Sequence, residues 1–218
     1  MTLAVLFHVA AGALALAAGG AALFCAKGSA GHRRAGLAFA LTMLAMALSG
    51  GIVSAAVLTG TAQRLNILVA AVTLYLVVTG WVAIRARPGE VAALDRGLCA
   101  FGVATAVAGV GLIAFAAANR QPASAGIYTV FTLIALRGAT LDLKLIRAGG
   151  ATPKQRLPRH LWRMCAALAI AAFAFFLGQQ DEFPQAIRGA HLALPPLAVL
   201  SAMIWWLVKL RPRTRAEA

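Results

Sequence analysis

Acidic residues are scarce in this chain. Its 218 residues include only 6 Asp and Glu against 20 Lys and Arg, and charged residues of both signs make up only 12%. A water-soluble domain carries about twice that share of charge. Such a domain could not hide 61% hydrophobic residues without exposing large apolar patches. The composition therefore excludes an ordinary soluble domain and indicates a protein whose solvent is lipid.

Cysteines are also few, and the motifs of common enzymes are missing. The 3 cysteines, Cys25, Cys99 and Cys165, show no CxxC spacing, so we expect free thiols and no disulfide framework. The chain has no HExxH motif, no serine nucleophile elbow and no carboxylate pair within an apolar stretch. Enzymatic activity is therefore not predicted. The net charge of +14 does not indicate nucleic acid either, because the basic residues lie at the ends of apolar stretches.

Seven apolar stretches reach or approach the length of about 20 residues that a helix needs to cross a bilayer. They cover residues 3–25, 36–59, 67–84, 98–118, 126–145, 161–178 and 190–208. Pro88, Pro122, Pro153 and Pro158 fall in the polar connections between them, where proline costs least. The sequence therefore predicts an all-α, polytopic transmembrane bundle of seven helices that forms a single domain.

The basic residues alternate between the two sides of this predicted bundle. Sixteen of the 20 Lys and Arg lie in or beside the first, third and fifth connections and in the tail, three lie in the other connections, and Arg137 lies within a span. Because short loops rich in Lys and Arg stay in the cytoplasm, we expect the N-terminus outside and the C-terminus in the cytoplasm. No Lys or Arg precedes the first stretch, so it is expected to be a retained span rather than a signal peptide. The basic side would then face anionic headgroups on the cytoplasmic side of a bacterial inner membrane.

Ionisable residues within an apolar stretch are costly in lipid, so they mark candidate functional sites. Arg137 lies about 15 Å from the predicted inner end of its helix. Two interpretations stay open: Arg137 faces the bundle interior and attracts an anion, or it snorkels to the inner interface. Asp142 lies five positions further on, so the two side chains do not stack as a pair. For Asp142 the favoured interpretation is an interfacial contact with Lys144 and Arg147.

The four histidines fall at two predicted depths. His32 and His160 lie at the inner edge, whereas His8 and His191 belong to the outer half. Such pairs would suit the axial positions of one or two six-coordinate haem b groups that pass electrons across a bilayer. The inner pair is preferred, because Met164 lies one turn from His160 and nearby arginines could pair with haem propionates. The alternative is an interfacial histidine that contacts headgroups, which we favour for His191.

The arginines available to the propionates are Arg33, Arg34, Arg159 and Arg163.

Short motifs along the chain resemble those of a known group of proteins. They are FHVAAG at residues 7–12, KGSAGHRRAG at 27–36, LYLVVTG at 74–80, and RHLWRM at 159–164 with Ala172-Phe173 after it. With these motifs, including an HRxxG-type motif that begins at His32, the chain resembles small uncharacterised bacterial membrane proteins that share a domain of unknown function. The resemblance implies a multi-spanning membrane protein but no activity, and His191 matches none of the motifs.

The sequence leaves three functions open. The first is a membrane electron-transfer protein with haem b ligated by His32 and His160. The second is a transporter or permeation protein for a small solute or ion, with Arg137 in the pathway and histidines as gates. The third is a structural or accessory subunit that docks on a membrane protein partner or on a second copy through its small-residue helices. The odd number of helices and the lack of an internal repeat argue against a standard inverted-repeat carrier.

Overall fold

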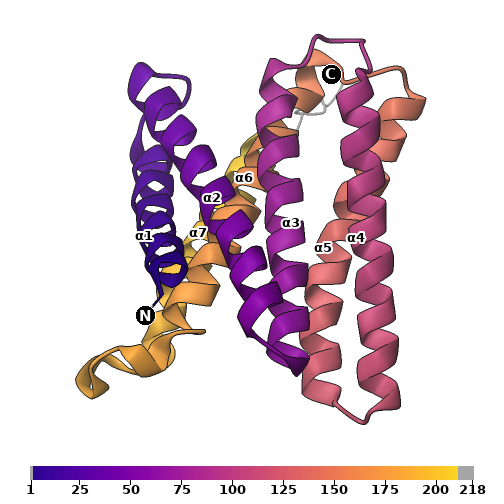
Figure 1. The fold of residues 1–218 in the computed structure, drawn as a ribbon. Helices are drawn as coiled ribbons and strands as arrows, with labels where there is room; N and C mark the ends of the chain where they lie inside the picture. Colours follow the sequence, from indigo (N-terminus) through magenta and orange to yellow (C-terminus); the bar gives the residue numbers. More distant parts are fainter. Residues whose placement is uncertain (1, 211–218) are drawn as a thin grey trace, which may run out of the picture.

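The computed structural model describes residues 2–210 and shows an all-α bundle (Figure 1). Its seven long helices are α1 (Leu3–Phe24), α2 (Ala30–Val57), α3 (Gly60–Arg85), α4 (Ala93–Ala118), α5 (Pro122–Arg147), α6 (Pro153–Phe176) and α7 (Leu194–Lys209). Three short 3-10 helices, η1 (Gln180–Glu182), η2 (Gln185–Ile187) and η3 (Ala190–Ala193), lie between α6 and α7. No strand occurs in residues 2–210. The predicted all-α, seven-helix bundle is confirmed, whereas its orientation stays a prediction.

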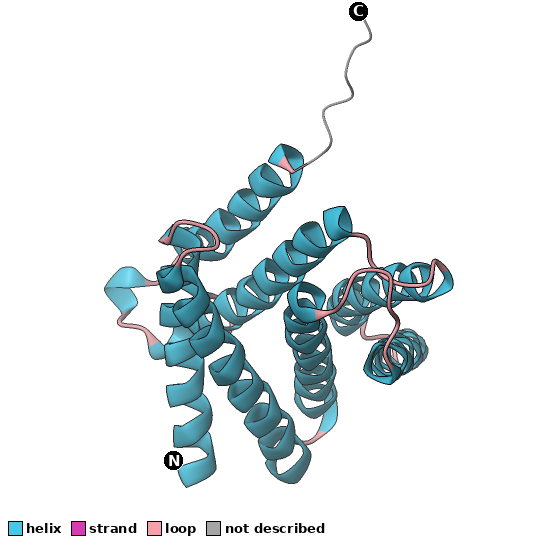
Figure 2. Ribbon diagram, turned by 90° about the horizontal axis from the view of Figure 1, so that it is seen from above, coloured by secondary structure: helices cyan, strands magenta, loops and turns pink. Residues whose placement is uncertain are grey.

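Helices α3 and α6 form the centre of the bundle. They pack against each other, with α1, α2 and α7 on one side and α4 and α5 on the other (Figures 1 and 2). The chain runs up and down, so that the loops 25–29, 86–92 and 148–152 lie at one end, which we call the basic end (Figure 1). Gly89 donates its N–H to the carbonyl of Ala151 at 3.2 Å, which joins two of these loops. Arg211, Arg213 and Arg215, part of the predicted basic tail, lie outside the described residues.

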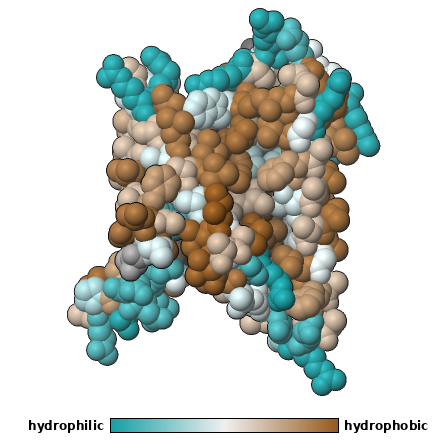
Figure 3. Space-filling view, in the orientation of Figure 1, coloured by the Kyte–Doolittle hydropathy of each residue, from teal (hydrophilic) through white to brown (hydrophobic). Residues whose placement is uncertain are grey.

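The outside of the bundle is apolar. Large hydrophobic side chains such as Val107, Leu133 and Ile204 are exposed, and they form an apolar band with hydrophilic residues above and below it (Figure 3). Six helices are long and apolar enough to cross a membrane, and among the seven α5 is the exception. We attribute this to the charged side chains that interrupt its second half. The apolar surface supports the prediction of an integral membrane protein, because a soluble protein would bury such residues.

Helix α6 begins earlier than its apolar residues indicate. It starts at Pro153 rather than at residue 161, so that Pro158 lies inside the helix and not in a connection. Pro153 occupies the first turn, where no backbone N–H is needed. The side chain of Gln155 accepts the backbone N–H of Thr152 at 2.9 Å and caps this start. The extension carries polar residues of α6 toward the basic end.

Candidate functional site

A cluster of charged side chains lies inside the bundle where α3, α5 and α6 meet. Arg163 and Asp142 are 0% and 2% exposed, and Arg159 is 9% exposed. Asp142 Oδ1 accepts hydrogen bonds from Nη2 of both arginines, at 3.0 Å from Arg159 and 2.5 Å from Arg163. Tyr75 donates its hydroxyl to Asp142 Oδ2 at 2.6 Å. Each of these partners is a donor, as an ionised carboxylate requires. We call these four residues the arginine cluster.

Helical spacing explains why two arginines reach one carboxylate. Arg159 and Arg163 are four residues apart on α6, so both project from the same face of the helix. At 1.5 Å rise per residue, they lie about 9 Å and about 15 Å from the start of α6. Asp142 lies in the last turns of α5, which the short loop 148–152 joins to α6. The cluster is therefore in the half of the bundle nearer the basic end.

Two glycines hold the ring of Tyr75 between α4 and α5. A Cβ atom built on Gly102 of α4 would lie 2.7 Å from Tyr75 Cε2, and one built on Gly138 of α5 would lie 2.5 Å from Cε1. A side chain at either position would overlap the ring, so glycine is required for these helices to close on it. The carbonyl of Gly138 also accepts a hydrogen bond from Arg163 Nη2 at 3.3 Å. The guanidinium of Arg163 lies 5.4 Å from the centre of the Tyr75 ring, a cation–π distance.

The two arginines have more donors than the cluster has acceptors. Within residues 2–210, the Nε and Nη1 atoms of Arg159 and Arg163 are buried without a hydrogen-bond partner. Asp142 is the one carboxylate of the described chain within 4.0 Å of either guanidinium. Asp95 is also buried, but it caps the start of α4 through the N–H of Ala92 and forms no such ion pair. Two guanidinium charges and one carboxylate charge leave the cluster at +1, which is costly in a low-dielectric interior.

Arg137 is not part of the arginine cluster. Its side chain is exposed on the outside of the bundle, where the guanidinium lies 5.8 Å from the centre of the Trp162 ring. This placement agrees with the snorkelling interpretation and not with an interior one. Asp142, in contrast, is more deeply buried than expected. It lies inside the bundle rather than at the interface with Lys144 and Arg147, because α6 brings two arginines to its buried face.

Each of the two inner histidines contacts a main-chain carbonyl. His160 Nδ1 lies 2.9 Å from the carbonyl oxygen of Gly80, and His32 Nδ1 lies 3.0 Å from that of Ala22. Since a carbonyl only accepts, Nδ1 is the donor in each ring, and in a neutral imidazole Nε2 then keeps its lone pair.

The two outer histidines have different surroundings. His8 Nδ1 lies 2.9 Å from the carbonyl oxygen of Met46, which ties α1 to α2. His191 is exposed on η3, and no hydrogen bond links it to His8 within residues 2–210. All three cysteines are free, and the described chain holds no group of three or more His, Cys, Asp or Glu that could bind a metal ion.

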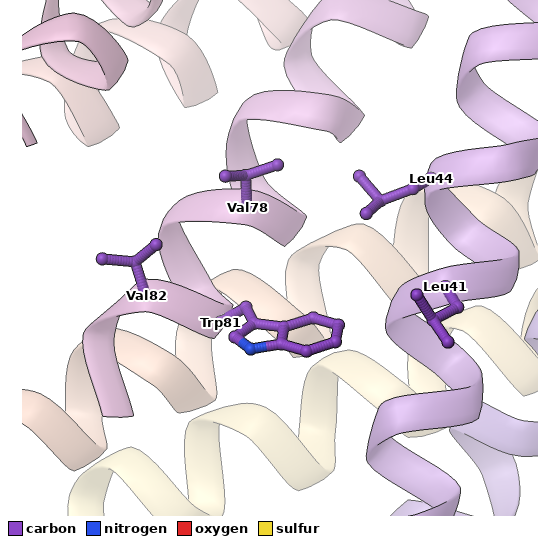
Figure 4. Close-up of a pocket in the computed structure, with 5 residues that line it drawn as sticks. All are labelled: Leu41, Leu44, Val78, Trp81 and Val82. Carbon is purple, nitrogen blue, oxygen red and sulfur yellow. The ribbon is translucent and has the colours of Figure 1, made fainter. Parts of the chain in front are cut away.

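Two shallow grooves lie on the outside of the bundle. A groove of about 300 Å³ runs between α2 and α3, with Trp81 facing Leu41 and Leu44 across it (Figure 4). A second groove of about 420 Å³ lies between α3 and α4, with Arg64 and Phe101 in its wall. Neither groove is lined by a histidine or by a residue of the arginine cluster. These grooves therefore supply no slot for haem at His32 and His160.

Comparison with known proteins returns nothing: no family model, no curated protein and no solved structure matches the chain. The resemblance to the bacterial membrane-protein group stays a prediction.

Sequence reasoning missed the arginine cluster, although part of its pattern is visible. Arg159 and Arg163 follow each other by one helical turn, and Asp142 is the lone carboxylate within the preceding apolar stretch. Assigning Arg159 to a connection hid this spacing. Tyr75 carries no sequence signal, since only the packing of α3 against α5 and α6 brings its hydroxyl to Asp142.

Proposed function

We propose that this protein is a multi-pass integral membrane protein that binds a small oxyanion at Arg159 and Arg163. One observation carries the proposal: two buried guanidinium groups share one carboxylate and keep four nitrogen atoms without a partner in the described chain. Guanidinium nitrogens only donate, so the partner has to be an acceptor. Buried water could accept these hydrogen bonds but would leave the positive charge in place. An oxyanion does both, because its oxygens accept hydrogen bonds and its negative charge offsets the positive one.

The anion would enter the bundle from the basic end. Arg159 lies one turn nearer that end than Arg163 and is the more exposed of the two. Arg163 is fully enclosed, so exchange of the anion requires α5 and α6 to part near the loop 148–152. With the predicted orientation in a bacterial inner membrane, this end faces the cytoplasm. In this proposal, the two arginines of α6 replace Arg137 as the candidate anion-binding residues of a transport pathway.

A saturable rise in the unfolding midpoint of the purified protein tests the proposal. A ligand that binds only the folded state stabilises it by RT ln(1 + [L]/Kd), which is about 2.7 kcal/mol at one hundred times Kd. Sodium nitrate and sodium formate are suitable probes, with ionic strength held constant by sodium gluconate, whose bulky anion does not fit a closed site.

Two variants identify the arginines responsible. Arg163→Gln should lose the saturable rise, because it removes one of the two guanidinium groups. Arg137→Gln is the matched control, since it removes an exposed arginine from the neighbouring helix and should keep the rise. No saturable rise in the wild type, or the same rise in Arg163→Gln, would contradict the proposal.

Haem b between His32 and His160 is the second candidate, and it would make the protein an electron-transfer protein. It is favoured because main-chain carbonyls hold Nδ1 of both rings and leave Nε2 available to iron. Haem supplies one-electron transfer, and Arg33 and Arg34 are exposed near His32 for its propionates. The fit is incomplete, since neither of the two grooves described above is lined by His32 or His160.

Oxidised and reduced visible spectra of the protein purified from haem-sufficient cells decide this second candidate. A stoichiometric haem spectrum that His160→Ala loses and His191→Ala keeps would support it, because His191 is exposed and remote from the inner pair. A colourless, folded protein would exclude it. A role as an accessory subunit or in a homo-oligomer stays a prediction.

A further inference from the structure

We infer that Asp142 sets the charge of the bound anion, so that the arginine cluster accepts a monovalent oxyanion in preference to a divalent one. This inference rests on the proposed anion binding and adds a specificity-determining residue to it. Its basis is the charge count of the buried groups, together with the position of Asp142 between the two arginines that would hold the ligand.

The cluster is one negative charge short of neutrality. Arg159 and Arg163 contribute two positive charges, Asp142 contributes one negative charge, and the hydroxyl of Tyr75 is neutral. A monovalent anion on the spare arginine nitrogens brings the sum to zero. A divalent anion would bring it to –1 and would place its extra charge beside the carboxylate, where repulsion is strong because little water screens it.

Asp142 is held so that it cannot move away from such a ligand. Both of its oxygens are engaged, Oδ1 by the two arginines and Oδ2 by the hydroxyl of Tyr75. The ring of Tyr75 is itself fixed between Gly102 and Gly138. The negative charge therefore stays in contact with both guanidinium groups, and a ligand has to bind at their remaining nitrogens, Nε and Nη1.

The preference can be measured with sodium nitrate and sodium sulfate on the full-length protein in lipid nanodiscs. In the wild type, nitrate should bind more tightly than sulfate. Asp142→Asn removes the negative charge at nearly constant shape and raises the cluster to +2. The affinity ratio of sulfate to nitrate should then rise by about tenfold or more. Asp142→Glu keeps the charge and should keep the wild-type order of affinities.

The possible outcomes distinguish a failure of this inference from a failure of the proposed anion binding. If neither salt binds to the wild type, the proposed anion site fails. If nitrate binds but the affinity ratio is the same in Asp142→Asn, anion binding stands and the role of Asp142 is overturned. Should Asp142→Asn fail to fold, the wild type alone still tests the inference, because tighter binding of sulfate than of nitrate would contradict the charge count.

Discussion

Alanine at Gly138 should destabilise the bundle, even though alanine favours a helix over glycine by about 1 kcal/mol. The new Cβ atom would lie 2.5 Å from Tyr75 Cε1 and 3.0 Å from the Tyr75 hydroxyl oxygen. The ring cannot retreat, because Gly102 of α4 closes on its other edge and Asp142 holds its hydroxyl. Helices α3, α4 and α5 would have to move apart to make room for the new methyl group, so the core would be overpacked.

The size of this destabilisation is best measured by comparison with alanine at another glycine of the same helix. A Cβ atom at Gly126 of α5 would meet nothing within 4 Å. Gly126→Ala and Gly138→Ala gain the same helix propensity, so the difference between them isolates the overlap with Tyr75. Overpacking of a close-packed interior costs about 1–3 kcal/mol. At about 2–4 °C for each kcal/mol in a protein of this size, the unfolding midpoint of Gly138→Ala should lie several degrees below that of Gly126→Ala.

Tryptophan fluorescence during heating of the purified variants in one detergent measures both midpoints. In a Tyr75→Ala background, adding Gly138→Ala should cost little further stability, because the two side chains would no longer overlap. Equal midpoints for Gly138→Ala and Gly126→Ala would refute the argument that glycine is needed beside the Tyr75 ring.

Three further predictions follow from the same geometry. Tyr75→Phe removes one hydrogen bond to the charged Asp142 and should cost about 1.5–3 kcal/mol of unfolding free energy in chemical denaturation, so an unchanged midpoint would contradict the bond. Arg137→Ala should change the unfolding free energy by less than about 0.5 kcal/mol, because its side chain is exposed, and a larger loss would show that Arg137 supports the interior. A reporter fused after Ala218 should be active only in the cytoplasm, and a periplasmic signal would reject the predicted orientation.

The helices of this protein could be predicted from the sequence because lipid imposes a length on them. A bilayer requires about 20 apolar residues, so stretches such as residues 98–118 stand out whatever their tertiary contacts. The helix ends were less predictable. Residues 154–159 of α6 are too polar to resemble a span, yet the helix continues through them, since a helix can extend past the hydrocarbon core into the interface.

The arginine cluster could not be predicted, because its members come from three helices. Periodicity shows which residues share a face of one helix, but it does not show which faces meet. Asp142 has basic neighbours on its own helix, so the sequence favoured these as its partners over the two arginines of α6 that it contacts. The same limit applies to His32 and His160, because the periodicity of α2 and α6 does not show how these two helices are placed relative to each other.

The pairing of Asp142 also bears on how the chain is inserted during synthesis. Helix α5 is not among the six helices apolar enough to count as candidate spans, and its carboxylate has partners that lie 17 and 21 residues later in the chain. A ribosome adding about 5–20 residues each second delivers these arginines about 1 to 4 s after Asp142. Until then, the unpaired carboxylate is disfavoured in the bilayer, by at most the about 2.5–3.5 kcal/mol that an Asp costs at the centre of a membrane helix. Helix α5 should therefore partition into the bilayer stably only together with α6, as a helical hairpin in which the arginines of α6 neutralise Asp142 of α5.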